Sequence, residues 1–181
     1  MAGKQANPLS SEAHPLPITH KSFLLSQIIV RSIAAITSLS ATILMVTDKQ
    51  SISLFGLPIT AKYTYAPAFR FFTASNSIAF AYSVLSLTYL LLKKAQGSGQ
   101  KIGFFVFLLD LIMVVVVMAG SSGATAMAWL GKYGNPHTGW LPICGTFKSF
   151  CFRAAFSLSL SYVSFFALFL LILLSRNKNT Q

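Results

Sequence analysis

Two charged side chains stand alone within apolar stretches of membrane-spanning length: Arg31 in the first stretch and Asp110 in the third. A charge at this depth costs roughly 2.5–3.5 kcal/mol on insertion scales, so each one needs a partner or a polar cavity. Arg31 follows Leu24 by seven residues and Asp110 follows Ile102 by eight. At the rise of an α-helix, both lie roughly 10–12 Å from one membrane boundary if the two spans are parallel. We therefore predict an intramembrane ion pair.

Two alternatives to the pair stay open. The long stem of Arg31 could lift its guanidinium to the lipid headgroups. Asp110 has too short a side chain for this, and unpaired it would be protonated or would face water in a proton or ion relay. Such a relay needs further intramembrane acids or histidines, and the other apolar stretches contain none.

The only two cysteines, Cys144 and Cys151, lie close together before the last apolar stretch. On an oxidising face of the membrane, two cysteines in one short loop favour a disulfide. Because the ring is small, the chain-entropy model credits it with about 2–3 kcal/mol. The alternative is a pair of free or metal-bound thiols. A zinc site needs four ligands, however, and His137 alone does not complete one, so we expect no metal or other cofactor.

Catalytic constellations are missing from the sequence. It contains no glycine-rich phosphate loop and no His-Glu-x-x-His. Its three acidic residues, Glu12, Asp48 and Asp110, lie far apart in sequence, so the chain offers no pair of carboxylates for acid/base catalysis. The serines of the last apolar stretch have no intramembrane histidine to act as a base. We expect a protein that is not an enzyme.

Composition and length identify the class of protein. With 54% hydrophobic and 9% charged residues, the chain predicts an all-α integral membrane protein. A membrane-spanning helix needs about 20 predominantly apolar residues. Four runs qualify and predict a four-transmembrane-helix bundle over residues 24–175, with a disordered tail before it (1–23) and a short tail after it (176–181). The four spans are expected at 24–46, 69–92, 102–124 and 154–175.

The distribution of lysine predicts the orientation. Lys93, Lys94 and Lys101 occupy the very short connection between the second and third spans. Positive charge in short loops is retained in the cytoplasm, so both termini are expected to be cytoplasmic. The net charge of +11 is spread over membrane boundaries, which indicates attraction to anionic membrane lipids and not to nucleic acid.

Aromatic residues gather in the two loops on the opposite side. For the tyrosines and the phenylalanine of the first loop, an interfacial belt is the simplest interpretation and a ligand-stacking surface the alternative. Small residues recur at four-residue spacing within the second and fourth spans, as is typical of helix packing. They could line the bundle of one chain or form an oligomer face. The loop aromatics are Tyr63, Tyr65, Phe69, Trp129 and Trp140, and the small residues are Ser75, Ala79, Ser83, Ser157 and Ser161.

Taken together, these features resemble one family. The sequence carries the two intramembrane charges, Tyr-x-Tyr-x-Pro-Ala-Phe-Arg-Phe-Phe from Tyr63 to Phe72, and Ile-Cys-x6-Cys from Ile143 to Cys151. This combination is similar to the plant Casparian strip membrane domain family, specifically its CASP-like branch, over all four spans. The loop at 47–67 departs from the strip-forming members, because it lacks their longer signature stretch.

The resemblance implies a multi-pass plasma-membrane protein that forms homo- and hetero-oligomers with related CASP-like proteins. In strip-forming members, such oligomers build immobile platforms that recruit secreted cell-wall-modifying enzymes. By position, Arg31, Asp110 and the two cysteines match family residues. A membrane scaffold is therefore expected. A small channel or transporter subunit is the alternative, although a pore would require a polar stripe along a span.

Overall fold

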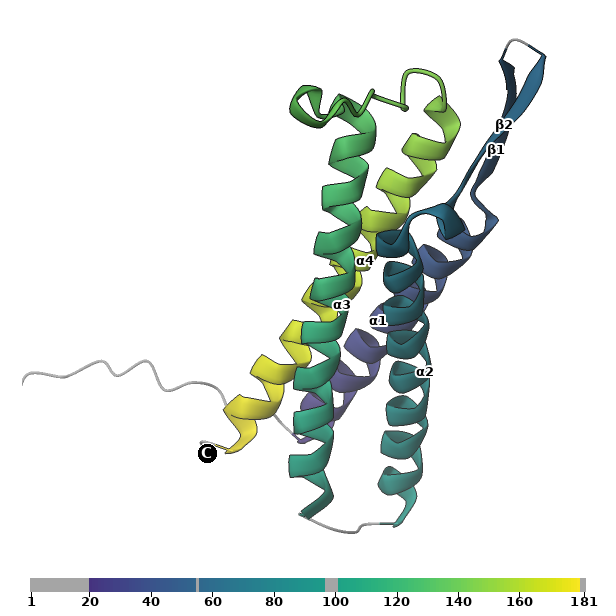
Figure 1. Cartoon of the computed structure of the whole chain (residues 1–181). Coiled ribbons are helices and arrows are strands. Elements are labelled where there is room, and N and C mark those ends of the chain that lie inside the picture. The colour runs from purple at the N-terminus through teal and green to yellow at the C-terminus, as the bar shows by residue number, and fades with distance from the viewer. Residues whose placement is uncertain (1–19, 55, 97–100, 180–181) are drawn as a thin grey trace, which may run out of the picture.

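Four long helices dominate the computed structural model, which describes residues 20–54, 56–96 and 101–179 (Figure 1). All four are long and apolar enough to cross a membrane, which confirms the number of helices expected. The helices are α1 (His20–Thr47), α2 (Pro67–Gln96), α3 (Lys101–Tyr133) and α4 (Lys148–Asn179).

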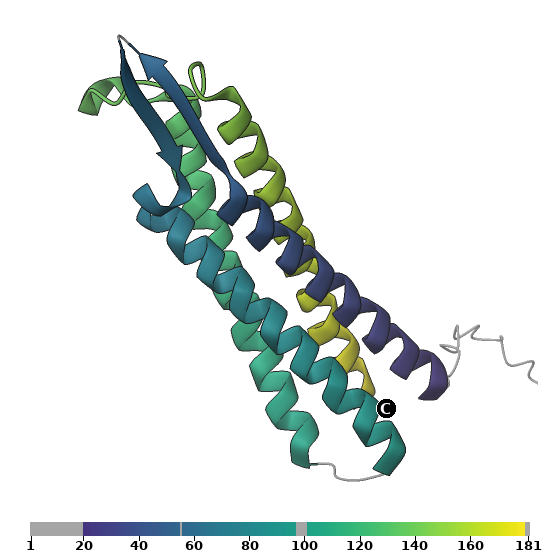
Figure 2. The same ribbon diagram turned by 90° about the vertical axis from the view of Figure 1, so that its right-hand side faces the viewer.

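The helices form a ring in which sequence neighbours are antiparallel. α1 packs against α2 and α4, and α3 packs against the same two helices, so that α1 and α3 face one another across the diagonal (Figures 1 and 2). α1 and α3 consequently run in the same direction. The predicted pairing of Arg31 with Asp110 requires this parallel arrangement, because only then do both residues lie at the same depth from one membrane boundary.

A two-stranded hairpin extends the chain beyond the helices at one end of the bundle (Figure 2). Strands β1 (Lys49–Leu54) and β2 (Leu57–Lys62) are antiparallel, with Lys49 opposite Lys62 and Leu54 opposite Leu57. Gly56 in the turn has a φ of 81°, which a glycine adopts without steric cost. A short 3₁₀ helix, η1 (Tyr63–Tyr65), leads from β2 into α2. The sequence predicts a loop over this segment, and the structure has a hairpin in its place.

Several helix ends differ from the predicted boundaries. α3 continues to Tyr133, where 124 was expected, and α4 begins at Lys148, where 154 was expected. Only residues 134–147, which include the 3₁₀ helix η2 (Pro136–Thr138), connect the two. Residues 176–179 extend α4, whereas a tail was expected. The rest of that tail, 180–181, and residues 1–19 of the N-terminal tail lie outside the described residues.

The apolar core is divided into two clusters. The one nearer the hairpin includes Met45, Phe72, Phe150 and Phe69, whose ring meets that of Phe150 edge-on with centroids 6.2 Å apart. The second includes Val117 and Leu168 and lies deeper between the helices. Each cluster contains residues of all four helices, so close packing within it fixes the helices in one arrangement.

Candidate functional site

The two intramembrane charges lie together in the structure. Arg31 Nη2 donates a hydrogen bond to Asp110 Oδ2 at 2.7 Å, and Nη1 donates one to Oδ1 at 3.0 Å. Both residues are almost fully enclosed, with exposed fractions of 1% and 0%. Two parallel bonds between a guanidinium and a carboxylate form the strongest and most directional ion-pair geometry that proteins use. The guanidinium thus lies inside the bundle and not at its surface.

α2 supplies the remaining partners of this pair. The hydroxyl of Tyr82 donates to Asp110 Oδ1 at 2.6 Å, and Arg31 Nη1 also donates to the Ser86 hydroxyl at 2.8 Å. The guanidinium carbon lies 6.0 Å from the centroid of the Tyr82 ring. These contacts join three helices at one point. The sequence does not predict roles for Tyr82 and Ser86, since a tyrosine and a serine in an apolar span carry no distinctive spacing.

A second polar layer joins α2, α3 and α4. Ser161 donates to Asn76 Oδ1 at 2.8 Å, and its hydroxyl lies 2.8 Å from that of Ser121. Asn76 also donates to the carbonyl of Phe72 at 3.0 Å. All three polar side chains are fully buried. Interhelical hydrogen bonds of this kind hold membrane helices together where lipid offers no hydrophobic driving force.

Serines also join α1 to α4. The hydroxyls of Ser38 and Ser164 lie 2.6 Å apart, and Ser157 donates to the carbonyl of Ala41 at 2.7 Å. Serines of α4 thus join this helix to α1 as well as to α2 and α3.

The small residues singled out by spacing lie inside the bundle. Each has an exposed fraction of 0% or 1%, so none of them is available to a second copy of the chain. Gly120 shows how close the packing is, because a Cβ at that position would collide with the side chain of Ser75. Of the two roles considered, these residues pack one chain against itself. They are Ser75, Ala79, Ser83, Ser157 and Ser161.

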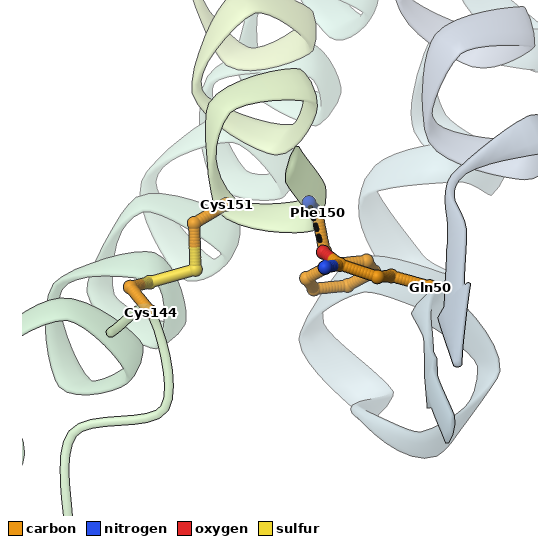
Figure 3. Close-up of a disulfide and its surroundings, with 4 residues drawn as sticks. All are labelled: Gln50, Cys144, Phe150 and Cys151. Carbon is orange, nitrogen blue, oxygen red and sulfur yellow. Dashed lines mark hydrogen bonds between the residues drawn. A yellow bond between two sulfur atoms is a disulfide. The ribbon is translucent and has the colours of Figure 1, made fainter. Parts of the chain in front are cut away.

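The predicted disulfide is present at the hairpin end. Cys144 in the connection after α3 is bonded to Cys151 in the first turns of α4, so Cys151 is helical and not in a loop as expected (Figure 3). The carbonyl of Gly131 accepts backbone hydrogen bonds from Ile143 at 2.9 Å and from Cys144 at 3.1 Å. The two hydrogen bonds fasten the connection to α3, and the disulfide fastens it to α4.

The hairpin is held to the same place. The side-chain oxygen of Gln50 on β1 accepts a hydrogen bond from the backbone N–H of Phe150 at 2.9 Å, beside the disulfide (Figure 3). That N–H belongs to the first turn of α4 and has no partner within the helix, so Gln50 satisfies a group that would otherwise be unpaired. Ile52 and Ala61 of the hairpin pack against the nearby core cluster.

Asp48, directly after α1, is the other described carboxylate and is also buried. Burial raises the pKa of Asp48 to about 6, and the positive charge of Arg153 acts in the opposite direction. Its Oδ2 atom has no hydrogen-bond partner among the described residues. The carboxyl group is therefore favoured in its neutral form when the solution is mildly acidic.

The aromatic residues expected in the loops have different environments. Tyr65 in η1 is 71% exposed, and Trp140 in the connection after α3 is 54% exposed. Trp129 lies on α3 and not in a loop, with its ring centroid 4.4 Å from that of Tyr133. Phe69 is 6% exposed and belongs to the core, which corrects its assignment to a loop surface. Tyr63 in η1 is half-buried against the core.

Within the described ranges, no three His, Cys, Asp or Glu side chains cluster in a way that could hold a metal ion. The polar groups of the spans instead form a bidentate ion pair and serine-rich contacts between helices. This arrangement, together with four helices long and apolar enough to cross a membrane, defines the class of four-helix multi-pass membrane proteins.

Comparison with known sequences agrees with this class. Residues 20–167 match the Casparian strip membrane protein domain, and the chain therefore belongs to the CASP-like membrane protein family. CASP-like protein 1F1 from Ricinus communis is 43% identical, with 98% of this chain and 95% of that protein covered. The protein of the same name from Vitis vinifera is 39% identical, with 100% of this chain and 86% of that protein covered. The one from Populus trichocarpa is 40% identical, with 90% of each chain covered. No solved structure matches.

Proposed function

We propose that this chain is a plasma-membrane scaffold, which associates with copies of itself and with related CASP-like proteins to organise a membrane platform. The observation that carries the proposal is the closed state of the Arg31–Asp110 pair. Both terminal nitrogens of Arg31 and both carboxylate oxygens of Asp110 are hydrogen-bonded inside the bundle, and only Arg31 Nε has no partner among the described residues. Because both side chains are also almost fully buried, the pair is closed to a substrate and to an ion relay. The pair serves to fix the bundle, and the outer surfaces serve to meet other proteins.

A surface for self-association must lie on the outside of the bundle, since the small residues of α2 and α4 are buried. α3 offers such a surface. Ala119, Ser122, Gly123 and Ala126 are all exposed and lie on one side of the helix at three- and four-residue spacing. A Cβ added at Gly123 would meet no atom within 4 Å, so the backbone there is open to close approach. Close backbone approach is what drives helix association in lipid.

The orientation of the bundle is part of the proposal. The first residue of α1 and the last of α4 lie at the end opposite the hairpin (Figure 1). Lys93 and Lys94 near the end of α2 and Lys101 at the start of α3 support a cytoplasmic position for that end. The hairpin and the disulfide then face the cell exterior, where secreted cell-wall-modifying proteins are the partners to be recruited. Tags at residues 97–100 should resist external protease in intact cells, whereas a tag at Gly56 should be cleaved.

Self-association is tested by enlarging one position of the α3 surface. In lipid nanodiscs or mild detergent, the unchanged protein should form dimers or larger assemblies, and Gly123→Leu should weaken them. Ala81→Leu is the matched control, because Ala81 is exposed on α2, away from the α3 surface. It should leave association unchanged. The proposal fails if the unchanged protein is monomeric at every concentration, or if it conducts ions in liposomes with a current that Asp110→Asn abolishes.

A further inference from the structure

A groove of about 630 Å³ opens at the hairpin end of the bundle. It lies between β2, the start of α2, the end of α3, the connection that follows α3 and the start of α4. Its volume is within the range of roughly 300–1,000 Å³ that is typical of small-molecule sites. The lining is predominantly apolar and includes Phe69, Ala128, Ile143, Phe147 and Leu158. The occupant of such a groove must present hydrocarbon.

Two polar side chains of the groove lining are paired with each other. Thr125 and Tyr162 both line it, and their hydroxyl oxygens lie 2.9 Å apart in a hydrogen bond to each other. Ala155 and Ser159 of α4 also line the groove and are exposed on the flank of a membrane-spanning helix. The groove is thus open toward the surrounding lipid as well as toward the hairpin. A hydrocarbon chain can enter it from the bilayer.

The outer part of the groove is positively charged. Lys62 of β2 and Lys132 of α3 both line it and are exposed, and neither pairs with a carboxylate in the part of the chain that the structure describes. The described carboxylate at this end is Asp48, which is buried. Two unneutralised ammonium groups above an apolar groove are complementary to an anionic headgroup that carries an acyl chain.

We propose that this groove binds an anionic glycerophospholipid of the adjacent leaflet, with one acyl chain along the α3–α4 flank and the phosphate beside Lys62 and Lys132. A phospholipid is favoured over a soluble amphiphile because the groove is open on the lipid-facing side. The site requires only a single chain, so it does not depend on self-association.

The two tryptophans of the sequence, Trp129 and Trp140, both line the groove and provide a direct signal. The protein is reconstituted in phosphatidylcholine vesicles that contain increasing fractions of phosphatidylglycerol with brominated chains, which quench nearby tryptophans. Quenching should saturate at a mole fraction roughly tenfold or more below that required with brominated phosphatidylcholine, as two lysines near a lipid surface imply. Equal quenching by the two lipids would overturn the proposal.

Charge variants separate the site from general surface attraction. Lys62→Gln with Lys132→Gln should remove the preference for phosphatidylglycerol. Lys49→Gln with Lys148→Gln removes the same charge at the same end, outside the groove lining, and should retain the preference. If both double variants reduce the preference for phosphatidylglycerol equally, the lysines act only as a diffuse charge and the site is refuted.

The shape of the groove is tested by Ala155→Phe, which adds a ring at its exposed edge. This variant should lose the preference for phosphatidylglycerol while keeping the disulfide and the thermal stability of the unchanged protein. Unchanged lipid preference would place the lipid elsewhere and overturn the proposal. Displacement by oleate at lower mole fractions than phosphatidylglycerol, or protection of both tryptophans by a cross-linked second copy, would assign the groove to another occupant.

Discussion

Arg31 of α1 and Asp110 of α3 are joined by two hydrogen bonds across the diagonal of the bundle, with 2.7 Å between Nη2 and Oδ2. The two helices form one of the two diagonal pairs of the ring, since α2 and α4 lie between them on either side. The ion pair is therefore a direct connection through the centre of the protein. It fixes the height of α1 relative to α3, and Tyr82 and Ser86 fix α2 to the same point.

Removing one charge of this pair should destabilise the protein more than removing both. Arg31→Leu or Asp110→Leu leaves an uncompensated buried charge, which costs about 3–5 kcal/mol. The double replacement removes that penalty and should recover much of the loss. Thermal unfolding in detergent and the yield of surface-delivered protein measure the effect. A double variant no more stable than the worse single variant would show that the charges act separately.

Tyr82→Phe should destabilise the bundle by about 1–3 kcal/mol, because Asp110 would lose a hydrogen bond in a buried site. Tyr89→Phe is the matched control on the same helix, since no hydrogen bond of the Tyr89 hydroxyl is present among the described residues. The two melting temperatures, compared in the same detergent, decide the matter. Equal losses in both variants would remove Tyr82 from the site.

Glycine positions on α3 provide a test of interior packing. Gly120→Ala introduces a Cβ that collides with Ser75, whereas Gly123→Ala introduces one into open space. In a helix interior, alanine is favoured over glycine by about 1 kcal/mol, so Gly123→Ala should be neutral or stabilising. Gly120→Ala should be destabilising in spite of the same preference. Melting temperatures that rise for both variants would contradict the packing of α2 against α3.

The spans and the ion pair were accessible from the sequence because their signals are strong and local. A run of about 20 apolar residues predicts a helix by itself. Arg31 and Asp110 could be predicted as a pair because they lie at equal depth in the membrane if α1 and α3 are parallel. Tyr82, Asn76 and Ser121 were not predicted, because their roles depend on helix rotation. Rotation is set by packing of the whole bundle, and no spacing rule reports it.

Asp48 should make stability depend on pH. Its folded pKa of about 6 lies above the value of about 3.9 for an unfolded chain, so the folded protein binds the proton more tightly. The stabilising contribution is complete below about pH 4 and is lost as the pH rises through 6. The melting temperature of Asp48→Asn should exceed that of the unchanged protein at pH 7, and the two should converge near pH 4. A constant difference over this range would exclude Asp48 titration.

The hairpin shows where local sequence reasoning fell short. Residues 49–62 do alternate in polarity, with Gln50, Ile52 and Ala61 on the side that meets the core. Gly56 and Pro58 in this segment suit a tight turn and an edge strand as well as a loop. The contact of Gln50 with Phe150 spans 100 residues and could come only from the three-dimensional arrangement.

The most direct test of the scaffold proposal is to count subunits by stepwise photobleaching of the fluorescently tagged protein in a plant plasma membrane. We predict slowly diffusing spots that contain several subunits, whose number rises with surface density and includes co-expressed CASP-like relatives. Gly123→Leu should lower the subunit number, and Ala81→Leu should not. Freely diffusing single subunits at every density, unaffected by Gly123→Leu, would contradict the account.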